Sequence, residues 1–246
     1  MNNPEITAIM LTCGRIKWIG DSIESFYKQT YPNKKLLIID THPSNISFKI
    51  PLPLNVSYIK CKSKDFKTLG EKTLYALSLV KSDFTCMWED DDVWLSHHLE
   101  SCVKRIPVEV SDIPLRIGHD KCFYLEGDGE SIPFRGNITD GLWWCRYIFG
   151  HKDGHWQNAK DNPFDAHYMR LNFKDIIFTD ESPSYIYRWN NSQSHMSGFY
   201  DRMNHEEVYR FFEDAHSKEN ICDSVVDISW KIDYQSICNE ILKNKI

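Results

Sequence analysis

Four consecutive acidic residues, Glu89 to Asp92, are the part of this sequence best suited to chemistry. They directly follow an apolar run, Phe84 to Trp88, and apolar residues resume at Val93. Adjacent carboxylates repel one another, and a divalent cation relieves that repulsion because Mg²⁺ and Mn²⁺ prefer oxygen ligands. Mg²⁺ also commonly bridges carboxylates to substrate phosphates. The pattern predicts a cation site, and a solvated acidic turn without an ion is the alternative.

The segments that precede the acidic residues predict a parallel sheet that positions them. Residues 6–12 form a β-branched and apolar run that is typical of a buried strand, and residues 16–29 have apolar residues at helical spacing. Residues 35–40 are a second apolar strand that ends at Asp40. This order predicts a βαβ unit. Ligands bind outside the carboxyl ends of such strands, where the acidic residues would lie.

The remaining apolar patterns predict a regular first half and a less regular second half. In the first half we expect strands at 56–60 and 84–88 and helices at 68–80 and 95–106. In the second half we expect strands at 113–117, 122–125, 142–149, 175–179 and 184–187, loops at 150–162 and 190–197, and helices at 164–173, 204–216 and 225–242.

The composition is that of a globular protein. The chain has 246 residues, of which 41% are hydrophobic and 26% charged, enough for a substantial core. A net charge of −6 argues against a general nucleic-acid binder. No apolar run approaches the roughly 20 residues that span a bilayer, and the first residues lack a signal-peptide pattern, so we expect a cytoplasmic protein. The eight scattered cysteines predict reduced thiols rather than a zinc site.

Several short motifs resemble those of GT-A fold, family 2-like glycosyltransferases. They are the loop Thr12–Arg15, the helix end Gln29–Pro32, the strand Leu37–Asp40 and the acidic stretch Lys81–Leu95. Their order and spacing match the family, some of whose members come from bacteriophages. One departure is that Thr41-His42-Pro43 follows Asp40 where the family has Asp-Gly-Ser.

The resemblance, strongest over residues 6–100, implies an α/β fold of the GT-A (Rossmann-like) type. Such a fold has a mostly parallel central sheet flanked by helices, a mixed acceptor-binding second half and C-terminal helices. We expect one domain over residues 1–246. Residues 1–106 would bind the nucleotide-sugar, residues 107–203 the acceptor, and residues 204–246 would form closing helices.

The resemblance also implies a donor site. Thr12, Gly14 and Arg15 would cradle the base and ribose, together with Asp40. A carboxylate such as Asp40 suits a uracil N–H, although a strand-end cap is its alternative role. Lys72 stands where the family often has a basic or polar residue near the nucleotide, and a solvated lysine is the alternative.

Asp90, Asp91 and Asp92 match the DxD-type motif of the family. The resemblance implies that one carboxylate contacts the ribose and another holds Mn²⁺ or Mg²⁺ at the diphosphate. Asp90 and Asp92 are the favoured pair, and Asp91 stays open because alignment within four acids is ambiguous. Arg188 belongs to the family's Tyr-Arg motif near the donor. His195 would replace a family histidine as a metal or diphosphate contact.

Catalysis requires a second carboxylate that deprotonates the acceptor hydroxyl as a general base. The family's base lies at a helix start upstream of the Tyr-Arg motif. Asp165 is the first candidate here and Asp161 the second, while the full Glu-Asp pair of the family is absent. A helix N-cap is the alternative role of Asp165.

These features predict a metal-dependent, inverting glycosyltransferase that uses a UDP-sugar. The expected acceptor is a glycan or cell-surface saccharide. Hydroxymethylated bases of DNA, as in bacteriophage enzymes, are the alternative acceptor, although the acidic net charge disfavours phosphate contacts. A nucleotidyltransferase and an inactive sugar-nucleotide-binding module are the remaining alternatives. The sequence leaves the oligomeric state open.

Overall fold

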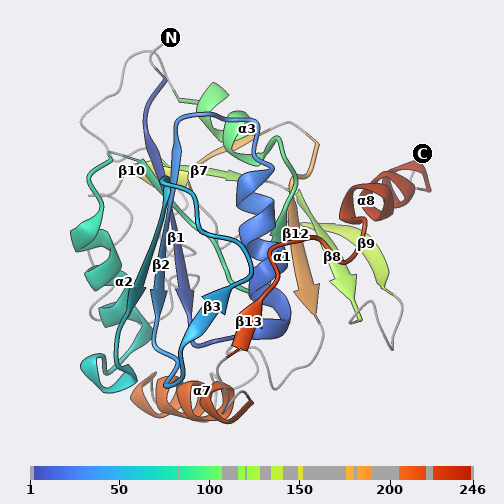
Figure 1. Cartoon of the computed structure of the whole chain (residues 1–246). Coiled ribbons are helices and arrows are strands. Elements are labelled where there is room, and N and C mark those ends of the chain that lie inside the picture. Colours follow the sequence, from blue (N-terminus) through green and yellow to red (C-terminus); the bar gives the residue numbers. More distant parts are fainter. Residues whose placement is uncertain are drawn as a thin grey trace.

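The computed structural model is built around a seven-stranded sheet (Figure 1). The ranges that the structure describes are 3–82, 84–106, 116–119, 121–127, 134–140, 149–151, 176–179, 182–189, 205–219 and 224–244.

The central sheet has a parallel half made by the N-terminal part of the chain. Strand β1 (Ile6–Thr12) pairs in parallel with β2 (Lys34–Asp40) and with β5 (Phe84–Met87), and β2 pairs with β4 (Val56–Lys60). Helix α1 (Ile16–Tyr27) connects β1 to β2, which confirms the expected βαβ unit. The carboxyl ends of these four strands therefore share one edge of the sheet.

The other half of the central sheet comes from the middle of the chain. Strand β10 (Phe149–His151) pairs antiparallel with β5 and with β7 (Arg116–His119), and β11 (Ile176–Thr179) pairs in parallel with β7. The full order is β11-β7-β10-β5-β1-β2-β4. The sheet is thus mostly parallel with one reversed strand, as the GT-A type requires.

The core follows from the apolar runs of the central strands. Ile6, Ile9 and Met10 of β1 and Ile38 and Ile39 of β2 have no exposed surface. Strands that are buried on both faces read as continuous apolar segments rather than alternating ones. The sheet is flanked by α1 and by α2 (Leu69–Leu79), whose first turn is capped by the Thr68 hydroxyl (Figure 1).

A second, four-stranded sheet begins directly after the acidic residues. Strand β6 (Val93–Trp94) pairs antiparallel with β12 (Tyr185–Trp189), which pairs in parallel with β8 (Lys121–Glu126), and β9 (Arg135–Asp140) forms the edge. Helix α8 (Tyr234–Lys243) packs Tyr234 and Cys238 against this sheet. The segment 88–92 therefore joins the two sheets.

The remaining elements surround these two sheets. Helix α3 (His98–Lys104) follows β6, and the short helix η1 (Ser63–Asp65) follows β4. Helix α7 (His205–Glu219) lies across the end of the central sheet toward which β1 and β2 point (Figure 1). Within the described part of the chain, no helix has the length and apolarity needed to cross a bilayer.

One sequence-based prediction of secondary structure was wrong, and a second had bounds that were too wide. The expected helix at 225–242 is instead the strand β13 (Ser224–Val226), which pairs in parallel with β3 (Ile46–Phe48), followed by α8. Asp233 caps α8 by accepting a hydrogen bond from the amide of Ser236, so this helix begins about nine residues later than expected. The helix expected at 95–106 is shorter, at 98–104.

Several further expectations can be placed only in part. The strands expected at 113–117 and 142–149 correspond to β7 and β10, each shifted toward the C-terminus. The loop expected at 190–197 and the helix expected at 164–173 lie outside the described residues.

Candidate functional site

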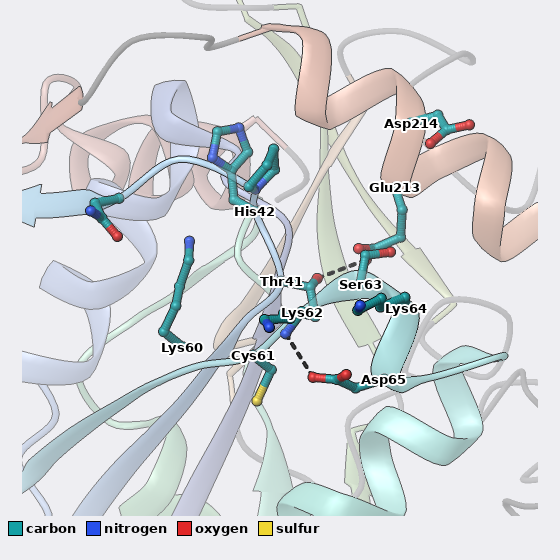
Figure 2. Close-up of a pocket in the computed structure, with 12 residues that line it drawn as sticks. Thr41, His42, Lys60, Cys61, Lys62, Ser63, Lys64, Asp65, Glu213 and Asp214 are labelled. Atoms are coloured by element: carbon teal, nitrogen blue, oxygen red, sulfur yellow. Dashed lines mark hydrogen bonds between the residues drawn. The ribbon is translucent and has the colours of Figure 1, made fainter.

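Two cavities lie at the carboxyl edge of the central sheet. The larger one, of about 650 Å³, is bounded by the segment after β2, by residues 60–65 and by α7 (Figure 2). The smaller one, of about 70 Å³, is bounded by the end of β1, the start of α2, the acidic residues and α7. Glu213 of α7 lines both cavities, so they adjoin at that residue.

The acidic segment is fixed by its apolar neighbours. The Trp88 and Trp94 rings stack with centroids 4.2 Å apart, and both side chains are fully buried. The Trp88 indole N–H donates to the carbonyl of Ser22 at 2.9 Å, and the Ser22 hydroxyl donates to the carbonyl of Glu89. These contacts with α1 hold the chain at the start of the acidic run.

Three of the four acidic side chains form a group that fits a divalent cation. Glu89, Asp90 and Asp91 each offer an oxygen, and these oxygens all lie within 4.8 Å of one another. Carboxylate oxygens are the ligands that Mg²⁺ and Mn²⁺ prefer, so the donor set suits either ion. The Arg15 guanidinium lies 3.1 Å from Asp90 and also contacts Asp91.

Burial makes the negative charge of this segment costly. It raises the pKa of Asp90 to about 6, with the opposing effect of Arg15 only partly offsetting it. Burial and the nearby charge of Asp91 raise the pKa of Asp92 to about 7. A bound divalent cation would favour the ionised form of carboxylates that contact it.

Asp92 faces away from the group of three. Its Oδ1 accepts a hydrogen bond from the backbone amide of Arg188 at 2.9 Å, and its Oδ2 accepts one from the Tyr185 hydroxyl. Both partners belong to β12, so Asp92 ties the acidic segment to the second sheet. The expected pair of Asp90 and Asp92 as functional ligands stays a prediction.

Arg188 is buried behind the acidic segment. Its guanidinium donates to Asp21 at 2.8 Å, to the Tyr234 hydroxyl at 2.7 Å and to the backbone carbonyl of Asp91. Its side chain has no exposed surface and stacks over the Trp18 ring at 4.6 Å. The structure places Arg188 where it positions the acidic segment, and its expected donor contact stays a prediction.

Asp40 ends β2 beside the larger cavity. Its Oδ1 accepts from the amide of His42 at 2.8 Å, and its Oδ2 accepts from Lys60 at 2.7 Å and from the Tyr58 hydroxyl. His42 and Lys60 line the cavity. The buried carboxylate thereby fixes the cavity wall, as expected for a strand-end cap, and its contact with a base is untested.

Thr12 and Lys72 line the smaller cavity, and Gly14 lies between two further lining residues, Cys13 and Arg15. Lys72 is buried rather than solvated, and its Nζ donates to the carbonyl of Thr12 at 2.8 Å and to the Thr41 hydroxyl at 2.7 Å. Gly14 has φ +82°, and a Cβ there would lie 2.5 Å from the His42 ring. Only glycine fits at this turn, which brings the loops after β1 and β2 together.

Glu213 is a site residue that the sequence reasoning missed. It lies on α7 at the junction of the two cavities, near Thr41 and Lys72. An acidic residue on an amphipathic helix has no local signature of burial, although its spacing from Tyr209 places both on one helix face. The candidate residues Asp161, Asp165 and His195 lie outside the described part of the chain.

Comparisons with known proteins bear on the family and the fold. A family model described as "Glycosyl transferase family 2" matches residues 7–186. A mannosyltransferase from Pyrobaculum calidifontis, in complex with GDP-Man and Mn²⁺, has a similar fold (TM-score 0.50, 10% identity, 88% of this chain and 70% of that chain). S. aureus TarS 1–349 aligns with a TM-score of 0.46 and 12% identity over 95% of this chain and 77% of that chain. A search of curated proteins found no match.

The likeness to the mannosyltransferase confirms the expected fold class. The order of the central strands, with a mostly parallel sheet and a separate mixed sheet, is that of a GT-A, Rossmann-like fold. The matched range 7–186 contains the Thr12–Arg15 loop, Asp40 and the acidic segment. Helix α7, which carries Glu213, lies beyond the matched range.

Proposed function

We propose that this chain, which belongs to glycosyltransferase family 2, transfers sugar from a UDP-sugar. The proposed reaction requires Mn²⁺ or Mg²⁺. The observation that carries the proposal is the group of oxygens from Glu89, Asp90 and Asp91 beside a cavity at the carboxyl edge of the sheet. These three residues would hold the ion.

The two adjoining cavities suit the two ends of a nucleoside diphosphate. The larger one, next to Asp40 and Lys60, has room for a base and ribose. The smaller one is lined by Arg15, Glu89 and Asp90, and so suits the diphosphate with its ion. The structurally similar mannosyltransferase was solved with GDP-Man and Mn²⁺, so a GDP-sugar is the donor to compare with a UDP-sugar.

The reaction is an inverting displacement. The acceptor oxygen bonds to the anomeric carbon as the bond to the diphosphate oxygen breaks, and a carboxylate takes the hydroxyl proton. A bound cation would stabilise the negative charge that develops on the leaving diphosphate. Arg15 lies at the same place and would add a second positive charge. Asp165 is the proposed base, with Asp161 as the second candidate.

The direct test is release of UDP or GDP from a panel of sugar nucleotides, with Mn²⁺, Mg²⁺ or EDTA. We expect UDP release from a UDP-sugar only with an ion, and we expect UDP to raise the melting temperature only with an ion. The Asp227→Asn variant removes an exposed carboxylate and should give the same results as the wild-type protein. Equal stabilisation by UDP in EDTA would contradict the metal requirement.

The base and the acceptor need separate experiments. Asp165→Asn should lower turnover about 10²–10⁴-fold with donor affinity unchanged, because a general base contributes about that much. Loss in Asp161→Asn alone would move the role to that residue. Mass spectrometry of products should find the sugar on a glycan, our proposed acceptor, and transfer to duplex DNA with hydroxymethylated bases would contradict this.

A further inference from the structure

The segment between β13 and α8 passes directly over helix α1 (Figure 1). The backbone carbonyl of Asp227 comes so close to α1 that a Cβ on Gly20 would lie 2.2 Å from its oxygen, so this approach requires glycine. The Trp230 indole N–H donates to the carbonyl of Asp21 at 3.1 Å. The C-terminal segment is thus held against the same helix that carries Asp21.

Tyr234, the first residue of α8, forms a closed triangle of hydrogen bonds with Asp21 and Arg188. Its hydroxyl donates to Asp21 Oδ2 at 2.7 Å and accepts from Arg188 Nη1 at 2.7 Å. The same Nη1 donates to Asp21 Oδ2 at 2.8 Å. Each of these residues is 3% exposed or less. Because hydrogen bonds in a low-dielectric interior strengthen one another, the three bonds act as a unit.

The guanidinium of Arg188 connects this triangle to the acidic segment. Its Nε donates to the backbone carbonyl of Asp91, and the Asp91 carboxylate belongs to the candidate ion group. A guanidinium is planar and rigid, so the bond from Nε and the bonds from Nη1 cannot adjust independently. The partners of Nη1 therefore help to set where the Asp91 backbone lies.

Such an outer group matters for an ion because it orients the residue that supplies the ligand atom. Loss of groups that hydrogen-bond metal-ligating residues typically weakens metal binding about 10–100-fold. In this protein the oxygens of Glu89, Asp90 and Asp91 come from three consecutive residues and lie within 4.8 Å of one another. A shift of the backbone at Asp91 would separate these oxygens.

We propose that Tyr234 is a positioning residue for the ion site, which acts through Arg188 to fix the backbone of Asp91. The proposal rests on the proposed function, which assigns a divalent cation to this group. Tyr234 lies beyond the range matched by the family model, 7–186. The ion site would then depend on the C-terminal segment of this chain as well as on the matched motifs.

The test is Tyr234→Phe, which removes the hydroxyl and keeps the buried ring. Binding of Mn²⁺ is measured by electron paramagnetic resonance, with and without saturating UDP. The variant should need about tenfold more Mn²⁺ for half-saturation, at the lower end of the range for outer groups because the hydroxyl acts through a second residue. Hydrogen exchange in EDTA should show faster exchange of the amides of residues 88–92, independently of any ion.

Two control variants separate positioning from stability. Tyr31→Phe removes a hydroxyl that donates to the carbonyl of Pro4 at 2.6 Å, outside the triangle, and should bind Mn²⁺ as the wild type does. Ile241→Val shortens an apolar side chain of α8 that packs against the core of the second sheet. It should lower the melting temperature and leave Mn²⁺ binding unchanged.

The other outcomes can be told apart. Wild-type Mn²⁺ binding by Tyr234→Phe would overturn the proposal while leaving the proposed function intact. Equal weakening in Ile241→Val would also overturn it, since ion binding would then follow stability alone. If the wild-type protein binds no Mn²⁺ with or without UDP, the metal requirement of the proposed function fails as well.

Discussion

Asp90 and Asp92 are two residues apart and equally buried, yet their carboxylates have different neighbours. Asp90 lies with Glu89 and Asp91 beside a cavity and contacts the Arg15 guanidinium. Asp92 has both oxygens hydrogen-bonded to β12. The chain is not a regular strand here, and Asp92 contacts β12 while Glu89, Asp90 and Asp91 stay together, so one acidic run supplies both a candidate ion site and an anchor to the second sheet.

The comparison separates what four acids in a row contribute. The Glu89–Asp91 group is organised around charge that a ligand can neutralise. Asp92 belongs to a closed network in which Arg188 also joins Asp21 and Tyr234. Substitutions in the Glu89–Asp91 group should therefore reduce activity, whereas substitutions that break the Asp92 and Arg188 network should reduce stability.

The largest effect is expected for Arg188→Ala. It removes the buried partner of Asp21 and the contact with the carbonyl of Asp91, and breaking a buried charge pair costs about 3–5 kcal/mol. Urea denaturation should show this loss. Arg135→Ala, an exposed arginine in the same sheet, should change stability by less than about 0.5 kcal/mol. Similar stabilities of the two variants would break the comparison.

A somewhat smaller effect is expected for Asp90→Asn, and it should fall on turnover. Removing a group that stabilises transition-state charge costs about 10²–10³-fold, so metal-dependent release of UDP should fall by that amount while the protein stays folded. Asp92→Asn should retain much more activity, because its amide can still accept from the Arg188 backbone and donate to the Tyr185 hydroxyl oxygen. Equal losses in both variants would instead support Asp92 as a ligand, as the sequence suggested.

The smallest effect is a pH dependence measured in EDTA. The pKa of Asp92 is raised in the folded protein to about 7, whereas an unfolded aspartate titrates near about 3.9. The folded state thus binds this proton more tightly, and the stability contributed by the protonated form is lost as the pH rises from about 4 through about 7. Asp92→Asn removes this dependence. The melting temperature of the variant, relative to that of the wild type, should therefore rise between pH 5 and pH 8. A constant difference would contradict the raised pKa.

The sequence was sufficient for the parallel half of the fold. Strands β1 and β2 and helix α1 have long apolar patterns whose period identifies them without reference to the rest of the chain. Strands β3 and β13 have three residues each, and they pair with each other although they are far apart in the sequence. No local sequence pattern therefore predicts them. The apolar residues at 225–232 suggested a helix because their spacing fits either structure.

The candidate site was predictable to the extent that strand ends define it. Thr12, Asp40 and Asp90 could be placed together because the carboxyl ends of parallel strands meet at one edge. The different surroundings of Asp90 and Asp92 could not be predicted, since they depend on hydrogen bonds from β12, nearly a hundred residues away. Glu213 was missed for the same reason. Asp161, Asp165 and His195 stay predictions.

The ion pair between Arg15 and the acidic group has a consequence for the order of binding. An incoming divalent ion must compete with a guanidinium already in contact with Asp90 and Asp91. A sugar nucleotide brings negative charge of its own, to which Arg15 can turn. Under the proposed function, a divalent ion should therefore bind weakly to the protein alone and strongly together with the donor, so that each ligand promotes binding of the other.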